Sequence, residues 1–299
     1  MAQIGRLLTA MVTPFTPEGA VDYAQAGRLA LALLESGSDG VVVAGTTGEA
    51  PTLTAEEKLR LFSEVKQVVG GSGLVVAGTS SYNTAESVEL SREAERTGAD
   101  GLLLTCPYYN KPTQEGIFRH FEAIARAVSL PCILYNIPGR TAVNITADTM
   151  IRLSRVPNIV GVKEASGNLE QIATIVENTR EDFQVWSGND GDTLPMLSVG
   201  GYGVVCVTSH LVGNQMRGMI EDYLAGRVED AARTHRRLLP LINVLMTAAS
   251  NPIPIKYALN LVGFQVGGLR LPLCEPDQAA GDKIAAEVKR HRIDLPVAV

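Results

Sequence analysis

Hydrophobic and polar residues follow two alternating patterns along this chain. Short, almost continuous apolar segments, bounded by glycine or polar turn residues, are typical of strands that are buried on both faces. The longer segments between them carry apolar residues at helical spacing, which predicts a helix after each strand. Eight segments have the strand pattern: 7–13, 40–44, 74–78, 101–105, 131–135, a lysine-containing segment that begins at Ile159, 183–186 and 203–208.

Capping residues mark where several of the predicted helices begin. Thr54 and Glu57 have the spacing of a capping box, in which the hydroxyl and the carboxylate satisfy free backbone donors of the first turn. Asn168 and Gln171 have the same spacing, and Asn83 stands at the start of another helical pattern. These positions agree with the alternation of strands and helices.

Eight strands, each followed by a helix, close most simply into a (β/α)8 TIM barrel with right-handed crossovers. An open doubly wound sheet is the alternative, but the first strand-to-helix turn is Thr-Pro-Phe-Thr at 13–16, not a glycine-rich phosphate loop. We predict a barrel core over residues 1–212, with its last helix running on beyond it, and a C-terminal helical region over 213–299. Helical segments are expected there at 215–224, 228–246 and 277–290.

Composition and charge exclude several classes of function. The 299 residues are 45% hydrophobic and 19% charged, which is typical of a globular protein. A net charge of -6 and the lack of a basic stripe argue against a nucleic-acid partner. The N-terminus lacks the apolar core of a signal peptide, and no run reaches the roughly 18 apolar residues that span a bilayer. We therefore expect a cytoplasmic protein without a membrane partner.

Cysteine and histidine residues do not form a recognisable site. Cys106, Cys132 and Cys206 fall within or at the ends of predicted strands, Cys274 lies far downstream, and no pair has CxxC spacing. We interpret the cysteines as buried small apolar residues in a reducing compartment. The four histidines show no HxH or HExxH spacing, so no metal site is predicted.

The strand pattern that begins at Ile159 contains a lysine, Lys163, in its middle. Burying an ammonium costs several kcal/mol unless it is paired or loses its proton. A buried amine whose pKa falls toward neutrality is a nucleophile that forms a Schiff base with a carbonyl substrate. The strand alone leaves the alternative open that Lys163 pairs with a carboxylate or extends out of the strand end.

Polar residues gather where other predicted strands end, which is where TIM barrels build their active sites. They are Thr46 and Thr47 after the second strand, Tyr108 and Tyr109 after the fourth, and Tyr135 at the end of the fifth. Each one alone is compatible with a turn or core role. Together with a mid-strand lysine they supply the hydroxyls and donors that a Schiff-base enzyme needs, which favours the catalytic interpretation.

These residues belong to motifs that resemble the dihydrodipicolinate synthase (4-hydroxy-tetrahydrodipicolinate synthase) family, within the pyruvate-dependent class I aldolase and lyase superfamily. The motifs are Gly-Thr-Thr-Gly-Glu at 45–49, Pro-Tyr-Tyr-Asn at 107–110, Tyr-Asn-Ile-Pro-Gly-Arg-Thr at 135–141, Gly-Val-Lys-Glu-Ala-Ser-Gly at 161–167 and Asn-Pro-Ile-Pro-Ile-Lys at 251–256. The resemblance spans essentially the whole chain.

The resemblance implies condensation of pyruvate with L-aspartate 4-semialdehyde, the first committed step toward diaminopimelate and lysine. Lys163 would form the imine with pyruvate, and the resulting enamine would attack the aldehyde. Tyr135, Thr46 and Tyr109 would relay protons, with Tyr109 reaching in from a neighbouring subunit. No metal or organic cofactor is implied, because the protein lysine itself acts as the electron sink.

Substrate-binding residues follow from the same resemblance. The pyruvate carboxylate would lie on hydroxyl and backbone donors at Thr46 and Thr47, and Gly188 and Val205 would line the pyruvate pocket. Arg140, whose planar guanidinium suits a carboxylate, would hold the acid end of the semialdehyde.

Two other functions stay open at the level of sequence. Another pyruvate-dependent aldolase, such as N-acetylneuraminate lyase or a 2-keto-3-deoxy sugar-acid aldolase, would share Lys163 and Tyr135, but Arg140 and the paired tyrosines speak against it. A non-catalytic metabolite-binding barrel would lack part of the catalytic set, which is complete here. The family also implies a homotetramer built as a dimer of dimers.

A possible effector site for lysine is only partly present. Glu86 and Tyr108 match effector-binding positions of the family, whereas Lys58 stands where lysine-sensitive members carry histidine, and Tyr82 replaces an asparagine. A fixed cation repels a cationic ligand, and a bulky ring occupies the space of an amide donor. We therefore predict an enzyme nearly insensitive to L-lysine.

Overall fold

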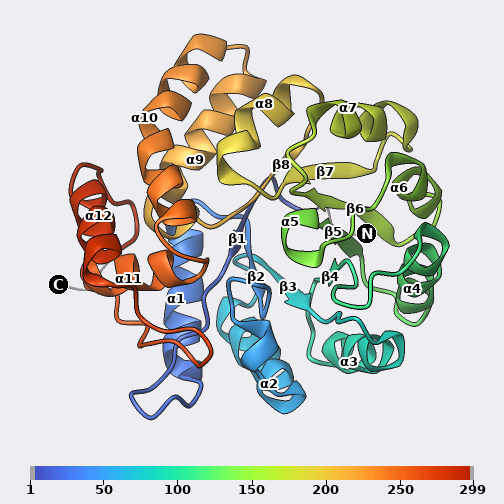
Figure 1. Ribbon diagram of the computed structural model, residues 1–299, viewed down its shortest axis with the longest axis horizontal. Coiled ribbons are helices and arrows are strands. Elements are labelled where there is room, and N and C mark those ends of the chain that lie inside the picture. Colours follow the sequence, from blue (N-terminus) through green and yellow to red (C-terminus); the bar gives the residue numbers. More distant parts are fainter. Residues whose placement is uncertain (1–3, 297–299) are drawn as a thin grey trace.

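Eight parallel strands close into a barrel in the computed structural model, which describes residues 4–296. Each strand pairs with its neighbours in sequence, and β1 also pairs with β8, so the sheet has no free edge (Figure 1). The predicted TIM barrel is therefore confirmed. The strands are β1 Leu7–Ala10, β2 Gly40–Val43, β3 Leu74–Gly78, β4 Gly101–Thr105, β5 Cys132–Asn136, β6 Ile159–Glu164, β7 Gln184–Ser187 and β8 Gly203–Cys206.

Helices surround the barrel, and the C-terminal helices pack together at one side of it (Figure 1). Around the strands lie α1 Tyr23–Glu35, α2 Ala55–Val69, α3 Thr84–Arg96, α4 Gln114–Arg126, α5 Pro138–Thr141, α6 Ala147–Leu153, α7 Leu169–Asn178, α8 Thr193–Ser198 and α9 Ser209–Leu224. Two short 3-10 helices, η1 Ala50–Thr52 and η2 Asp190–Asp192, lie in the connections. The extension consists of α10 Val228–Thr247, α11 Ile253–Leu261 and α12 Gln278–Val288. No helix within residues 4–296 combines the length and apolar character needed to cross a membrane.

The predicted capping residues begin their helices as expected. Thr54 and Glu57 form both hydrogen bonds of the capping box at the start of α2. Asn83 caps α3, and the Asn168 side chain accepts a hydrogen bond from the backbone N–H of Gln171 at the start of α7. The helix starts that the sequence placed with a capping residue are therefore confirmed.

β1 and β8 are shorter than predicted because side chains take over the backbone hydrogen bonds at their ends. The backbone N–H groups of Val207 and Thr208 donate to the Asp190 carboxylate, at distances between 2.6 and 3.2 Å. The backbone N–H of Val12 donates to Nε2 of His210 at 3.2 Å. These residues leave the sheet without leaving a buried donor unsatisfied.

Two features of the C-terminal half differ from the prediction. Helix α9 begins at Ser209 and not near residue 215, and the backbone of Val212 within it is non-helical, with φ -132° and ψ 42°. The expected boundary after residue 212 falls inside this helix, and the division into two parts stays a prediction. Helix α11 was not expected, because Pro252 and Pro254 flank its start; proline is tolerated there because the first turn needs no N–H donor.

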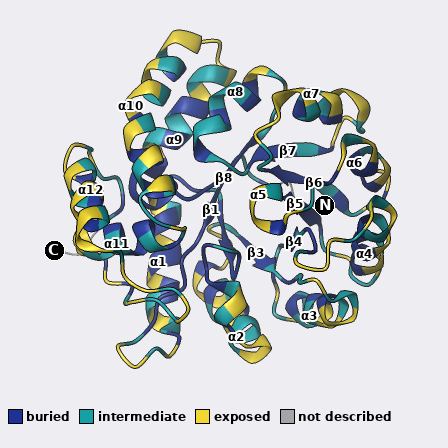
Figure 2. Cartoon of the chain, in the orientation of Figure 1, coloured by how far each residue is buried: buried dark blue, intermediate teal, exposed yellow. Residues whose placement is uncertain are grey.

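Burial follows the layers of the barrel. Strands and the inner faces of helices are buried, whereas the outer helix faces are exposed (Figure 2). Cys106, Cys132 and Cys206 are buried as predicted. The expectation is wrong for Cys274, which is exposed in the connection between α11 and α12, where no strand or helix covers it.

Candidate active site

Lys163 lies near the C-terminal end of β6 with its side chain inside the barrel. It is paired in register with Tyr135 on β5 and Trp186 on β7, and it is only 5% exposed. Within residues 4–296, no carboxylate lies within ion-pair distance of its amine, so the alternative of a structural ion pair has no support there. The prediction of a buried lysine in this strand is confirmed.

Burial changes the protonation of Lys163. Removal from water disfavours the ammonium and lowers the pKa of the amine to about 8, while the nearby Asp190 carboxylate acts in the opposite direction. About a tenth of the amine is therefore neutral at pH 7, far more than for an ordinary lysine. This is the condition that nucleophilic attack on a carbonyl carbon requires.

Tyr135 lies directly beside the amine. Nζ of Lys163 is 4.1 Å from the centroid of the Tyr135 ring, and the tyrosine is 4% exposed. Burial raises the pKa of the phenol far above neutrality, with smaller opposing effects from the charge of Arg140 and from the Thr46 side chain. Tyr135 therefore keeps its proton at physiological pH and can donate it to an oxygen that develops negative charge.

The loop after β2 places Thr46 and Thr47 at the C-terminal ends of the barrel strands. Thr46 is partly buried and lines a cavity, whereas Thr47 is buried at 3% exposure. The hydroxyl of Thr47 accepts a hydrogen bond from Nδ2 of Asn251 at 2.9 Å. Asn251 was quoted in the sequence motif 251–256 but was not predicted as a site residue, because its contact with Thr47 depends on packing between distant segments.

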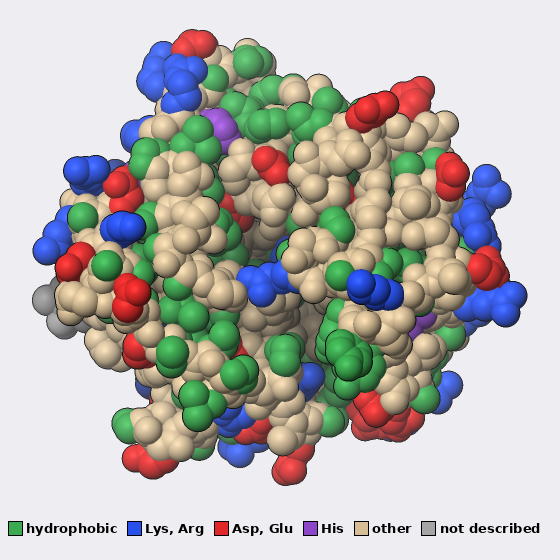
Figure 3. Space-filling view, in the orientation of Figure 1, with side chains coloured by type: hydrophobic (Ala, Val, Ile, Leu, Met, Phe, Trp, Pro, Cys, Tyr) green, Lys and Arg blue, Asp and Glu red, His purple; other side chains and the backbone are tan. Residues whose placement is uncertain are grey.

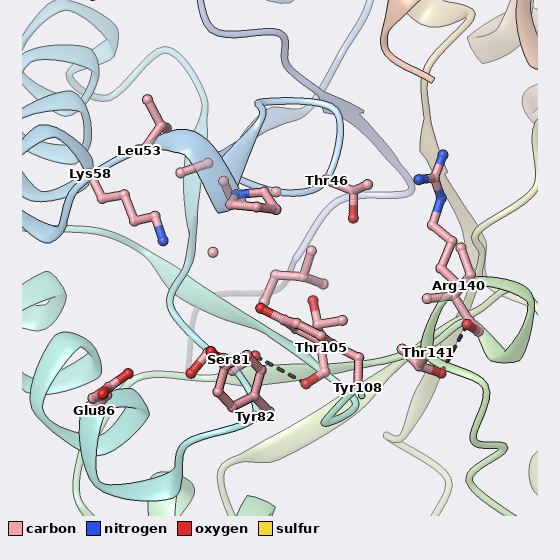
Figure 4. A pocket seen from close by; sticks show the side chains of 18 residues that line it. Thr46, Leu53, Lys58, Ser81, Tyr82, Glu86, Thr105, Tyr108, Arg140 and Thr141 are labelled. Atoms are coloured by element: carbon pink, nitrogen blue, oxygen red, sulfur yellow. Dashed lines mark hydrogen bonds between the residues drawn. The ribbon is translucent and has the colours of Figure 1, made fainter. Parts of the chain in front are cut away.

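Arg140 lies in the short helix α5, which follows β5 directly. Its side chain is exposed, and Nη2 donates to the backbone carbonyl of Asn251 at 3.2 Å. The guanidinium stands on the opposite side of the cavity from Lys58 (Figure 4). This position at the cavity wall fits the predicted contact with a carboxylate.

Gly188, which follows β7, lies against the stem of Lys163. A Cβ atom on Gly188 would lie 2.7 Å from Cβ of Ala165 and 3.2 Å from Cγ of Lys163, so only glycine fits against these two side chains. Val205 is fully buried in β8. Asp190 was not predicted, although it directly follows the polar end of the seventh strand; its carboxylate binds the backbone after β8 and influences the pKa of Lys163.

A cavity of about 330 Å³ connects the strand ends to the space between α2 and α3. Figure 3 shows the corresponding hollow near the centre of this face, with cationic side chains beside it. The predicted residues that line it are Thr46, Arg140, Lys58, Tyr82, Glu86 and Tyr108, most of which point into the space in Figure 4. The other predicted residues do not line it: Lys163, Tyr135, Thr47, Gly188, Val205 and Tyr109.

Lys58 and Glu86 face the same cavity from different helices. Lys58 extends from α2 and Glu86 from α3 (Figure 4). Burial lowers the pKa of Lys58, and no acidic partner lies within ion-pair distance of it among residues 4–296. The rings of Tyr82 and Tyr108 meet edge to face, with centroids 5.1 Å apart. The candidate effector residues therefore all line one cavity.

Tyr109 is not brought into this chain's own cavity. It is 88% exposed, and its φ of 69° is rare for a residue with a side chain.

Within residues 4–296, no cluster of histidine, cysteine or acidic side chains is arranged to hold a metal ion. The absence of a metal or organic cofactor stays a prediction.

The sequence matches the dihydrodipicolinate synthetase family over residues 3–291. The chain belongs to this family. A 4-hydroxy-tetrahydrodipicolinate synthase of Dehalococcoides mccartyi (strain CBDB1) is 58% identical over 297 residues, covering 99% of this chain and 100% of that protein. The resemblance that the motifs indicated is confirmed.

Solved structures of the family have the same fold. A dihydrodipicolinate synthase from Bacillus anthracis matches with a TM-score of 0.95 at 43% identity, covering 97% of this chain and 99% of the other. The dihydrodipicolinate synthase (DHDPS) from Cyanidioschyzon merolae, solved with lysine bound, matches with a TM-score of 0.95 at 48% identity, covering 97% of this chain and 98% of the other.

Proposed function

We propose that this family member works through a Schiff base on Lys163. The chain is a lyase that condenses pyruvate with L-aspartate 4-semialdehyde to 4-hydroxy-tetrahydrodipicolinate, on the route to diaminopimelate and lysine. Membership of the family favours this reaction over that of N-acetylneuraminate lyase or a sugar-acid aldolase. The observation that carries the mechanism is a buried amine with a pKa of about 8, lying 4.1 Å from the ring centroid of Tyr135.

The covalent steps follow from the chemistry of an amine and a 2-keto acid. The neutral amine of Lys163 attacks C2 of pyruvate, and the carbonyl oxygen leaves as water after it has received two protons. The protonated imine withdraws electrons, so C3 loses a proton and an enamine forms. C3 of the enamine then bonds to the aldehyde carbon of the second substrate, and the aldehyde oxygen takes up a proton. Hydrolysis or attack by the substrate's own amine releases Lys163.

Tyr135 and Thr46 are the proposed proton carriers within one chain. The Tyr135 phenol is protonated and adjacent to the amine, so it can protonate the departing oxygen and later receive a proton from C3. Thr46 acts on the Tyr135 phenol and also lines the cavity, which gives the proton a route toward it. The third proposed member of the relay, Tyr109, comes from the neighbouring subunit.

The carboxylates of pyruvate and of the semialdehyde would bind at different walls of the site. Hydroxyl and backbone N–H groups at Thr46 and Thr47 would hold the pyruvate carboxylate, because fixed donors bind an anion without reorganising. Gly188 and Val205 would border the pyruvate methyl group. Arg140 would bind the carboxylate of the semialdehyde, and its contact with the Asn251 carbonyl limits where the guanidinium can lie.

Assembly and location extend the proposal. An 88% exposed tyrosine held at a rare backbone angle fits a residue whose function lies in another subunit. We accordingly infer that Tyr109 completes the relay of a partner chain; the homotetramer built as a dimer of dimers stays a prediction from the family. The cytoplasmic location stays a prediction.

The cavity between α2 and α3 is the proposed effector site, with reduced affinity for lysine. The Cyanidioschyzon merolae relative was solved with lysine bound. In this chain the ammonium of Lys58 has no acidic partner within residues 4–296 and points into the cavity, where it would repel the ammonium groups of lysine. The ring of Tyr82 lines the same cavity.

Trapping the imine tests the central step. Sodium borohydride added with pyruvate should attach one pyruvate-derived group to Lys163 and abolish activity, whereas borohydride alone should do neither. Peptide mass spectrometry locates the modified residue. The substitution Lys163→Arg should prevent both labelling and turnover, because a guanidinium keeps its charge and cannot form the imine. Labelling at another lysine would refute the mechanism.

A further inference from the structure

A buried ion pair ties the loop after β2 to the C-terminal helices. Glu49 follows Thr46 and Thr47 in this loop, and Oε1 of its carboxylate lies 2.8 Å from Nζ of Lys256 in α11. The Lys256 and Glu49 side chains are 1% and 0% exposed. Burying two charges costs several kcal/mol for each ion, so a pair at this depth persists only when its remaining hydrogen-bonding groups are satisfied.

Both members of the pair have further partners. The Lys256 amine also donates to the backbone carbonyl of Gly268 and lies 4.2 Å from the ring centroid of Phe15. The backbone N–H of Arg270 donates to Oε2 of Glu49 at 3.0 Å. Both carboxylate oxygens of Glu49 are therefore held by residues that lie outside the barrel sequence.

A second contact joins the same two segments. Asn251 lies shortly before Lys256 in sequence, and its Nδ2 donates to the hydroxyl of Thr47 at 2.9 Å. Its backbone carbonyl accepts from Arg140 at 3.2 Å. The segment that includes the start of α11 thus contacts two proposed substrate-binding side chains and, through Lys256, the end of the loop that presents one of them.

The backbone of Glu49 explains why the loop needs this attachment. Its φ of 56° and ψ of 35° lie in the left-handed region, which costs a residue with a side chain about 1 kcal/mol or more. Such a conformation persists only when surrounding contacts enforce it. The contacts of the Glu49 carboxylate with Lys256 and Arg270 provide that constraint.

We propose that Glu49 and Lys256 are positioning residues that hold Thr46 and Thr47 in the geometry that binds the pyruvate carboxylate. The proposal rests on the proposed function, in which these threonines bind pyruvate. It assigns to the C-terminal helical region a direct influence on pyruvate affinity. Neither charged group needs to touch the substrate, because both act through the backbone of the loop.

Removing the pair should raise the KM for pyruvate. Lys256→Met keeps the length of the side chain and removes its charge, and Glu49→Gln keeps the shape of the other partner. We expect Lys256→Met to raise the pyruvate KM about tenfold, equivalent to about 1.4 kcal/mol, and Glu49→Gln to raise it less. The double variant should be less impaired than the sum of the two single changes, because both changes remove the same interaction.

Lys66→Met is the matched control. Nζ of Lys66 in α2 lies 2.7 Å from the carboxylate of Asp100, the residue before β4. This ion pair lies at the opposite end of the strands from the site. This variant loses an ion pair and should keep the wild-type KM for pyruvate. Thermal unfolding of every variant shows how much folded protein contributes at the assay temperature.

The outcomes separate positioning from stability alone. If Lys256→Met or Glu49→Gln lowers only the melting temperature or kcat and leaves the pyruvate KM at the wild-type value, the proposal is wrong. If Lys256→Met does not fold, Glu49→Gln decides by the same criterion. Borohydride labelling at saturating pyruvate should still modify Lys163 in each folded variant. Failure of labelling in the wild-type protein would instead refute the proposed function.

Discussion

The amine of Lys163 owes its reactivity to where its strand lies in the barrel. β6 is covered on both sides, so the ammonium would lose most of its hydration without gaining an acidic partner within residues 4–296. Burial therefore lowers the pKa of the amine to about 8 and raises the fraction of the neutral form, which is the form that attacks a carbonyl. Asp190 limits the shift, because its carboxylate stabilises the protonated form.

The pH dependence of imine formation follows from that balance. Below about pH 8 most of the amine is protonated and cannot attack, so the rate of imine formation should rise with pH, reach half of its maximum near pH 8 and level off about one pH unit higher. Rapid mixing with saturating pyruvate, borohydride quenching and mass spectrometry at each pH would measure it. A midpoint near 10.5, the ordinary value for lysine, would contradict the assignment.

Asp190→Asn provides the companion measurement. Removing the carboxylate removes an attraction that favours the ammonium, so the midpoint should move to lower pH than in the wild-type protein. An amide can still accept a hydrogen bond from the backbone after β8, which preserves part of the local structure. An upward shift of the midpoint would show that Asp190 does not act on Lys163 through its charge.

Single residues differed in how far the sequence could reveal them. Lys163 was predictable because a lysine interrupts a locally readable apolar strand pattern. Asn251 and Asp190 were not predictable from the sequence. Asn251 acts through a contact with Thr47, and Asp190 through contacts with the backbone after β8, and only the fold brings these segments together. Local pattern identifies a residue that conflicts with its own element, but not one that fits its element and acts on another.

At the scale of elements, the succession of strands and helices was predictable because each pattern is local. The capping residues of α2, α3 and α7 added correct starting points. The end of β8 was not predictable, because Asp190 from another segment takes its backbone donors. Helix α11 was missed because its prolines suggest a loop unless their place in the first turn is known.

The cavity between α2 and α3 leads to a prediction about lysine. We expect little inhibition of the enzyme by submillimolar L-lysine in a steady-state assay. A like-charge contact with Lys58 and the loss of an amide donor at Tyr82 each cost about 1–3 kcal/mol, so together they would weaken binding roughly 30-fold or more. Strong inhibition at submillimolar lysine would show that these two side chains do not block the site.

A double substitution tests the cause. Lys58→His with Tyr82→Asn removes the fixed ammonium and restores an amide, so inhibition by lysine should appear or strengthen. Glu86→Gln in that background should weaken it again, since its carboxylate is the cavity group suited to an ammonium. Lysine sensitivity that stays unchanged through all three substitutions would place the effector determinants elsewhere.

At the scale of the whole molecule, one chain does not bring together every proposed catalytic group. Lys163 and Tyr135 meet within the barrel, whereas Tyr109 projects from the loop after β4 and is 88% exposed. A relay that needs all three requires a second chain. In a two-fold dimer each chain would give its tyrosine to the other, which makes the two sites mutually dependent.

Mixing two inactive variants tests that dependence. Tyr109→Phe and Tyr135→Phe subunits should each have low activity alone, since each homodimer lacks one hydroxyl at both sites. In a mixed dimer, one site combines an intact Tyr135 with the partner chain's intact Tyr109, while the other site lacks both hydroxyls. With equal input and free exchange, half of the dimers are mixed and one of their two sites is intact, so about a quarter of wild-type activity should return. Because the two variant chains have the same mass, one of them must be isotope-labelled, so that native mass spectrometry can verify the exchange. If mixed dimers form and no activity returns, Tyr109 does not serve the neighbouring site.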